Sequence, residues 1–206
     1  MKTIYLPCLE SGSPVSLVAI YFCRLLCSCQ YKGGRMSNFK ITAEDLTWLD
    51  DPVNDPQDHC LHGHAVVQIG ERTVEYTCTV SATALYLLKT LTEDHAIGQD
   101  NQLLPCCGHF LIASEDLMNT TIIGCDYGED WSVEHSGSQV ILTLKDGYQV
   151  SVPIDEYRAE VYRFADKIEA YYNSCPPREE HTDEFNRNGY VAFWNEWHRR
   201  RNASIT

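Results

Sequence analysis

The chain has 206 residues, of which 44% are hydrophobic, so it is long enough to bury one globular core. Its 29 acidic and 16 basic residues give a formal net charge of −13, which repels nucleic-acid backbones and anionic membrane surfaces. The sequence contains no run of 18 apolar residues, no Gly-rich phosphate loop and no residue pattern of a known hydrolase or dehydrogenase. We therefore expect neither a nucleic-acid nor a membrane partner, and the sequence predicts no particular reaction.

The first 35 residues differ from the rest because they carry four basic residues and one acidic residue. The segment Lys32-Gly-Gly-Arg35 directly precedes Met36 and corresponds, as codons, to a purine-rich ribosome-binding sequence. We therefore expect residues 1–35 to be a non-native leader read in frame. The alternative is a lipoprotein signal, with residues 15–22 as its apolar core and residues 26–29 as its processing box. On the first interpretation residues 36–206 form one cytoplasmic domain with six reduced cysteines.

The domain is expected to begin with irregular structure. Residues 45–58 are rich in acids and turn formers, and their two Asp-Pro pairs end any helix that begins near Thr42. We expect an ordered loop there, or a short helix followed by a loop. Alternation with a period of two then predicts a β-hairpin up to residue 78, with Gly70-Glu71 as its turn. Ser81 is expected to cap a helix that continues to about Asp94.

Short strands separated by Gly-containing turns are expected after Asp100. They lie at residues 110–113, 121–125, 131–135, 140–144 and 148–154. Two helices follow, one over 156–173 with Asp155 as its cap and one over 182–201. These elements predict an α+β domain, in which an antiparallel sheet of short strands and hairpins is covered on one face by about three helices.

Two compact clusters of cysteine and histidine precede predicted strands, one at residues 60–64 and the other at residues 106–109. In an extended chain, alternate side chains of the first cluster project to one face, and two of them with two from the second would complete a tetrahedral zinc site. Two alternatives remain open. The cysteines are buried small hydrophobes beside satisfied histidines, or Cys106 or Cys107 is a nucleophile with a histidine as its base. The predicted zinc ligands are Cys60, His62, Cys107 and His109.

A run of acidic residues without any base lies between Lys40 and Arg72. A clustered negative field accelerates association with positively charged surfaces, so we expect a docking face for a basic protein. The alternative is a solvated loop, and the adjacent acids Glu129 and Asp130 are likewise expected at the solvated surface. The predicted docking face consists of Glu44, Asp45, Asp50, Asp51, Asp55 and Asp58.

The last predicted helix carries an aromatic stripe at Tyr190, Phe193, Trp194 and Trp197, which is the spacing of one helix face. We expect this face to be buried. The basic residues 198–201 would then complement the negative end of the helix dipole.

Four segments together resemble a family of small acidic bacterial proteins of unknown function. They are DHCLHG at 58–63, LPCCGH at 104–109, WSVEH at 131–135 and GYVAFWNEWHRRR at 189–201, and the similarity extends over about residues 43–201. The resemblance implies no activity, cofactor or catalytic residue. The general build is similar to that of immunity proteins, which neutralise toxins, many of them basic nucleases.

The charge and the lack of a catalytic set lead us to expect a non-enzymatic acidic binding protein, with an immunity protein as the particular hypothesis. The main alternative is a zinc-binding protein, structural or catalytic, built on the two Cys/His clusters. A further alternative is a structural subunit, which would expose a large apolar patch.

Overall fold

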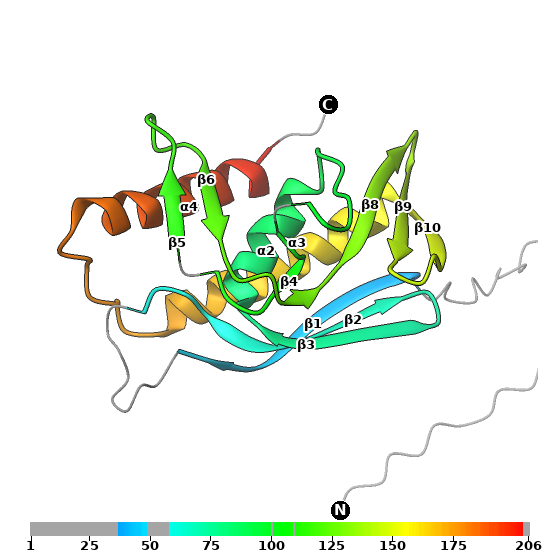
Figure 1. Cartoon of the computed structure of the whole chain (residues 1–206), viewed down its shortest axis with the longest axis horizontal. Coiled ribbons are helices and arrows are strands. Elements are labelled where there is room, and N and C mark those ends of the chain that lie inside the picture. The colour runs from blue at the N-terminus through cyan, green and yellow to red at the C-terminus, as the bar shows by residue number, and fades with distance from the viewer. Residues whose placement is uncertain (1–36, 49–57, 100, 109, 204–206) are drawn as a thin grey trace, which may run out of the picture. The chain divides into compact units, whose positions relative to one another are not determined.

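The computed structural model describes residues 37–48, 58–99, 101–108 and 110–203, which belong to one unit that begins at Ser37 (Figure 1). The predicted leader lies outside the described residues. Within the described part of the chain, no helix is long and apolar enough to span a bilayer.

A three-stranded antiparallel sheet, with the order β1-β2-β3, begins the fold. Its strands are β1 (Phe39–Thr47), β2 (His62–Ile69) and β3 (Arg72–Cys78). The second and third strands form the predicted hairpin, and Gly70 supplies the positive φ of 59° that its two-residue turn requires. This part of the prediction is confirmed.

Strand β1 includes residues 42–47, for which the sequence predicted a loop or a short helix, so the prediction was wrong there. The rest of the predicted loop, apart from Trp48 and Asp58, lies outside the described residues. Phe39, Ile41 and Ala43 alternate toward the interior and are at most 1% exposed. The register with β2 then shifts between Glu44 and Thr47, in a bulge where Asp45 has a φ of 51°. Because the bulge interrupts the alternation after five residues, the period-two signal is too short to stand out from an acidic background.

Helix α3 (Ile154–Ser174) protects the outer edge of β1. The Arg163 guanidinium donates to the carbonyl oxygen of Ile41 at 3.2 Å, and the Lys167 ammonium donates to that of Ala43 at 2.5 Å. One turn further on, the Tyr171 hydroxyl donates to Leu46. These contacts satisfy backbone groups that would otherwise present an open strand edge.

The strands that follow β3 form several small sheets. The predicted meander is present as β8 (Trp131–Ser136), β9 (Gln139–Leu144) and β10 (Gln149–Pro153). The predicted strands at 110–113 and 121–125 pair as a hairpin, β5 (Phe110–Ala113) with β6 (Thr120–Ile123). The sequence did not predict β4 (Leu104–Pro105) and β7 (Gly128–Glu129), whose two-residue lengths carry no periodicity.

The remaining helices are α2 (Val80–Lys89) and α4 (Glu184–Arg201). Ser81 is not the cap of α2, because Thr79 holds that position and the Ser81 hydroxyl accepts the N–H of Leu61 at 3.1 Å. The helix also ends at Lys89, before the predicted end at Asp94. Directly after this end, the Thr90 hydroxyl donates back to the carbonyl oxygen of Leu87. Helix α3 likewise begins at Ile154 rather than after a capping Asp155.

Helix α2 lies in the middle of the fold, with α3 and α4 against it (Figure 1). Its first nine residues are all buried, so it is covered on every side rather than amphipathic. The largest fully buried side chains of the fold include Trp131, Tyr157 and Trp197. The α+β class is therefore confirmed, with several small antiparallel sheets and three helices.

Candidate functional site

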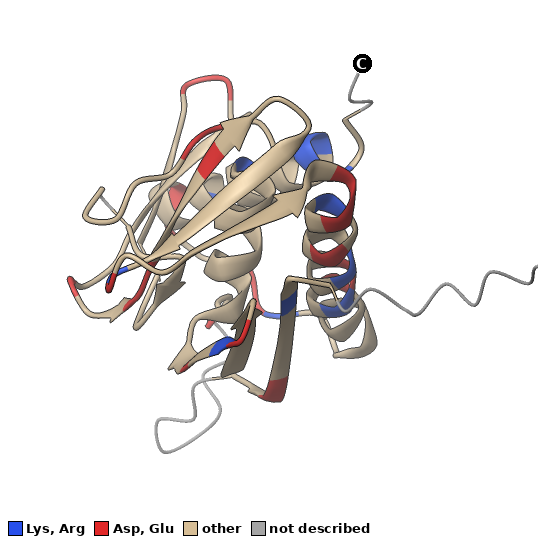
Figure 2. Ribbon diagram, turned by 90° about the vertical axis from the view of Figure 1, so that its right-hand side faces the viewer, with Lys and Arg blue, Asp and Glu red and all other residues tan. Residues whose placement is uncertain are grey.

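Acidic and basic residues are distributed unevenly along the fold. Helices α3 and α4 together hold seven acidic and seven basic residues. Residues 90–153, which connect α2 to α3, hold ten acidic residues and a single base, Lys145. Figure 2 shows the same contrast, with both signs alternating along a helix at the right and acidic residues prevailing on the strands and turns. The excess negative charge of the described residues therefore lies mainly on this connecting region, which we call the acidic segment (residues 90–153).

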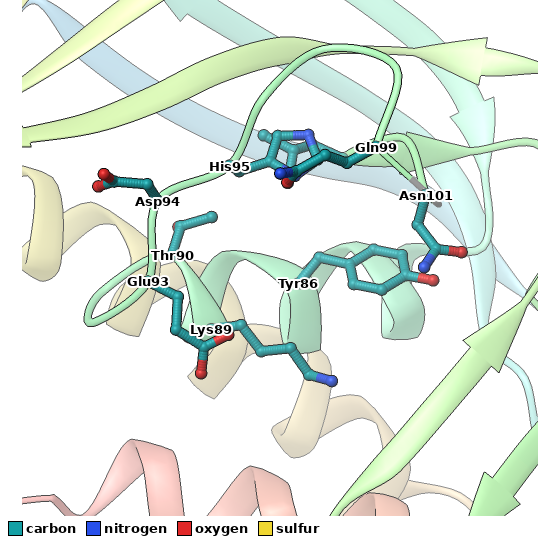
Figure 3. A pocket seen from close by; sticks show the side chains of 9 residues that line it. Tyr86, Lys89, Thr90, Glu93, Asp94, His95, Gln99 and Asn101 are labelled. Carbon is teal, nitrogen blue, oxygen red and sulfur yellow. The ribbon is translucent and has the colours of Figure 1, made fainter.

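A polar pocket of about 400 Å³ opens between the end of α2 and the first loop of the acidic segment (Figure 3). Lys89 and Glu93 lie on one side of it, and His95 and Gln99 face them from the loop. The lining is completed by Tyr86, Thr90, Asp94, Asn101 and Leu103.

His95 is held in place by a buried carboxylate. Its Nε2 donates to Asp130 Oδ1 at 2.8 Å, and the same oxygen accepts the N–H of Leu103 at 3.1 Å. The backbone of His95 also pairs with Val133 of β8 in both directions, at 2.8 Å. Asp130 is only 4% exposed, so the expectation of a solvated carboxylate at this position was wrong.

The mouth of the pocket carries two exposed carboxylates. Asp94 Oδ1 lies 2.7 Å from His135 Nδ1. Hydrogen bonds from the side chain and the backbone of His135 lower the pKa of Asp94. Glu93 accepts from Arg200 at 2.6 Å. Both side chains keep more than half of their surface in solvent, so each has lone pairs left for a further donor.

The single Lys or Arg among the lining residues points away from those carboxylates. Lys89 Nζ lies 3.4 Å from Glu196 Oε1 of α4 and donates to the carbonyl oxygen of Thr120 at 3.0 Å. Glu196 is 1% exposed and also accepts from Arg200 at 2.8 Å and from the Thr120 N–H at 2.8 Å. Lys89 is therefore committed to a buried ionic network and leaves the mouth negative.

The hydroxyls that line the pocket are also committed. Thr90 Oγ1 bonds to the Leu87 carbonyl oxygen and lies 2.7 Å from the Tyr157 hydroxyl, while the Tyr86 hydroxyl donates to Ile122. The lining also contains the carboxylates of Glu93 and Asp94, the carboxamides of Gln99 and Asn101, and the imidazole of His95. Such a set suits the recognition of a hydrogen-bond donor that carries positive charge.

The acidic docking face that the sequence predicts is described only in part. Glu44 and Asp45 are exposed at the β1 bulge, whereas Asp58 is 9% exposed and accepts the N–H of Cys60 at 2.9 Å. Asp58 thus anchors the backbone of its own loop. Asp50, Asp51 and Asp55 lie outside the described residues, so the complete predicted face stays a prediction.

The two Cys/His clusters do approach each other. Cys60 Sγ lies 3.5 Å from the carbonyl oxygen of Gly108, which follows Cys107. Burial and the neighbouring Asp58 raise the pKa of the Cys60 thiol to about 12. His62 lies 3.9 Å from Asp58 through its Nε2 atom.

No three His, Cys, Asp or Glu side chains converge to hold a metal ion in the described part of the chain. Cys107 instead faces Cys125, whose backbone N–H donates to Cys107 Sγ at 3.0 Å. The fourth predicted ligand, His109, lies outside the described residues, so the zinc site stays a prediction.

The His95–Asp130 pair was not predictable from the sequence, because its members are 35 positions apart and meet only when β8 pairs with the loop. A count of charges by segment would have located the acidic segment. Comparisons with protein-family models, with curated proteins and with solved structures found no match for this chain.

Proposed function

We propose that this protein binds a partner protein through its acidic segment and that the partner presents a basic surface. The observation that carries the proposal is the charge contrast between the balanced helices α3 and α4 and a segment with ten acids and one base. A one-sided field of this kind speeds the encounter with a positively charged protein and disfavours acidic partners.

In this proposal the polar pocket lies at the centre of the docking surface and receives a side chain of the partner. A pocket of about 400 Å³ is large enough for an arginine or lysine side chain from the partner. Glu93 and Asp94 at the mouth would pair with its charge. Inserted side chains of this kind, desolvated at the centre of an interface, supply much of the binding energy of protein complexes.

The role that we propose within this class is that of an immunity protein, which occludes a basic toxin. The acidic composition and the small α+β build support this role. The predicted face around Glu44 and Asp45 would extend the same contact, because exposed acids there also lack Lys or Arg partners within the described residues.

The test is a quantitative capture experiment followed by reconstitution. Extracts of the producing organism are passed over three immobilised proteins: the wild type, Glu93→Gln/Asp94→Asn, and the control Glu156→Gln/Glu184→Gln. The control removes the same number of charges from exposed positions in the first turns of α3 and α4.

We expect a basic protein on the wild type and the control, with clearly less on the pocket variant, and a one-to-one complex when the purified proteins are mixed. Equal capture by all three baits, or a captured protein that is acidic, would contradict the proposed docking surface. If the captured protein is a toxin, co-expression of the wild type should restore growth and co-expression of the pocket variant should do so less well.

A further inference from the structure

Three cysteine thiols gather where the loop before β5 meets the loop after β6. The backbone N–H of Cys125 donates to Cys107 Sγ at 3.0 Å, and the backbone N–H of Cys106 donates to Tyr127 at 2.9 Å. Cys106 is exposed, and Cys107 and Cys125 are half-buried, so a small molecule reaches the group from solvent. All three are free thiols.

Gly124 allows the two loops to come this close. A Cβ atom at position 124 would lie 2.2 Å from the carbonyl oxygen of Cys107, a distance that no side chain tolerates. The same Cβ would lie 3.8 Å from Cys107 Sγ, so the absence of a side chain at 124 brings Cys107 against the residue that follows.

From this juxtaposition we propose that Cys107 and Cys125 form a thiol–disulfide exchange site, which reacts with small disulfides and closes to an intramolecular bridge. The site lies within the acidic segment, but its chemistry does not require the proposed partner.

The surroundings assign different roles to the two thiols. Cys107 Sγ already accepts the backbone N–H of Cys125, and Cys107 is followed by the buried Gly108, whereas Cys125 is followed by the exposed Asp126. An incoming disulfide therefore reaches Cys125 more readily, so Cys125 is the attacking thiol and Cys107 the resolving thiol.

The reaction balances without any other reagent. The Cys125 thiolate attacks one sulfur of a disulfide RS–SR, forms a mixed disulfide with one RS group and releases the other as RS⁻. The Cys107 thiolate then attacks the Cys125 sulfur, breaks the mixed disulfide and releases the second RS⁻. The two protons lost by the protein thiols are taken up by the two released thiolates, so the protein is oxidised by two electrons and RS–SR is reduced to two RSH.

The charge around the site selects among disulfides. The exposed Asp126 directly follows Cys125, whereas the nearby Glu129 is paired with Lys145 at 3.1 Å. An acidic environment repels anionic reagents and attracts cationic ones. We therefore expect the order cystamine, then 2-hydroxyethyl disulfide, then glutathione disulfide, from fastest to slowest.

The experiment treats the reduced full-length protein with each of these three disulfides and identifies the modified thiols by peptide mapping. Fragmentation spectra distinguish the adjacent Cys106 and Cys107. Cys125 should react with cystamine about tenfold faster than Cys175, the half-buried cysteine that serves as the internal reference. The wild type should accumulate the Cys107–Cys125 bridge.

Variants separate the two steps. Cys107→Ser should stop at a mixed disulfide on Cys125, Cys125→Ser should lose the bridge, and Cys175→Ser should behave as the wild type. Equal modification of Cys125 and Cys175, or a bridge that joins Cys106 instead of Cys107, would overturn the assignment. The wild-type mapping gives this answer even if a variant fails to fold.

Discussion

The two C-terminal helices and the acidic segment differ in how far their charged side chains are balanced by opposite charges. Along α3 and α4 most basic side chains have a carboxylate within reach, as in Arg158–Asp155 at 2.8 Å and Arg201–Asp166 at 2.5 Å. In the acidic segment Lys145 pairs with Glu129 at 3.1 Å, and nine acids remain without a base from the same segment. Local pairing cancels the field of the helices, whereas the acidic segment projects its field into solvent.

Pairing on the helices serves packing. In the acidic segment Glu93 pairs with Arg200 and Asp146 with Arg72, yet the segment keeps the net negative charge that a docking surface for a basic partner requires. The Glu196 network joins α4 to α2 and to Thr120, the first residue of β6. An exposed ion pair contributes little to stability, but a buried one is costly to break. The two regions should therefore respond differently to the same kind of substitution.

The largest loss of stability is expected from Glu196→Ala, which removes the buried carboxylate of the ion-pair network on α4. The variant leaves Lys89, Arg200 and the N–H of Thr120 without their shared acceptor inside the protein. We expect the free energy of unfolding to fall by about 3–5 kcal/mol, measured by urea denaturation. Glu156→Gln, an exposed charge on α3, should change it by less than about 0.5 kcal/mol. Equal effects of the two substitutions would show that the network is not structural.

Gly189→Ala tests the contact between α4 and the acidic segment. Replacing glycine by alanine within a helix normally stabilises it by about 1 kcal/mol. Here the added Cβ would lie 2.3 Å from the carbonyl oxygen of Leu111 in β5. We expect a loss of about 1–3 kcal/mol in the same assay. The control is Val191→Ala, at an exposed position of α4, and a stabilised Gly189→Ala would mean that α4 does not lie against β5.

His59 provides a pH-dependent test in the loop that precedes β2. Burial lowers the pKa of His59, whose Nε2 donates to Glu179 at 2.6 Å and whose Nδ1 is buried without a hydrogen-bond partner among the described residues. Below its ordinary pKa of 6.5 the unfolded chain therefore binds a proton that the folded chain resists, so stability is lost as the pH falls through this value.

Urea denaturation at about pH 7.5 and about pH 5.5 should show a smaller pH-dependent loss for His59→Gln than for the wild type. His64→Gln, on the exposed face of β2, is the control and should retain the loss of the wild type. An unchanged loss in His59→Gln would exclude His59 as its source.

The smallest expected change in stability accompanies a change in surface potential. NMR relaxation by small cationic and anionic nitroxide probes should show a stronger preference for the cation at amides of residues 90–153 than along α3 and α4. Glu93→Gln/Asp94→Asn should weaken that preference around the pocket while lowering stability by about 1 kcal/mol, because Glu93 pairs with Arg200 and Asp94 accepts from His135. A uniform preference over the whole surface would remove the contrast on which the proposed function depends.

Elements with enough periodic residues and a turn or cap were predictable from the sequence. The β2–β3 hairpin, the β8–β10 meander and helix α4 fall close to their predicted bounds. The Asp183 side chain, just before α4, accepts the Asn186 N–H at 2.8 Å as a helix cap should. The predicted burial of the aromatic stripe is confirmed for Phe193 and Trp197, while Tyr190 and Trp194 are half-buried.

Features that depend on long-range contacts were not predictable. Strand β1 depends on its pairing with β2, and the acceptors on its outer edge are satisfied by α3, more than 110 residues away. The sequence placed Cys60 and Cys107 in one site, and the structure does bring residues 60 and 108 together. It did not indicate that Cys107 would face Cys125, because that contact depends on the close approach of two loops at Gly124.

The most direct test of the proposed function is the association rate of the captured partner with purified protein, measured over a range of salt concentrations. For the wild type and for Glu156→Gln/Glu184→Gln, the rate should fall steeply and equally as salt increases. For Glu93→Gln/Asp94→Asn, the rate at low salt should be about tenfold lower and its dependence on salt shallower. Identical rates and salt dependences for all three proteins would contradict the claim that the acidic segment is the docking surface.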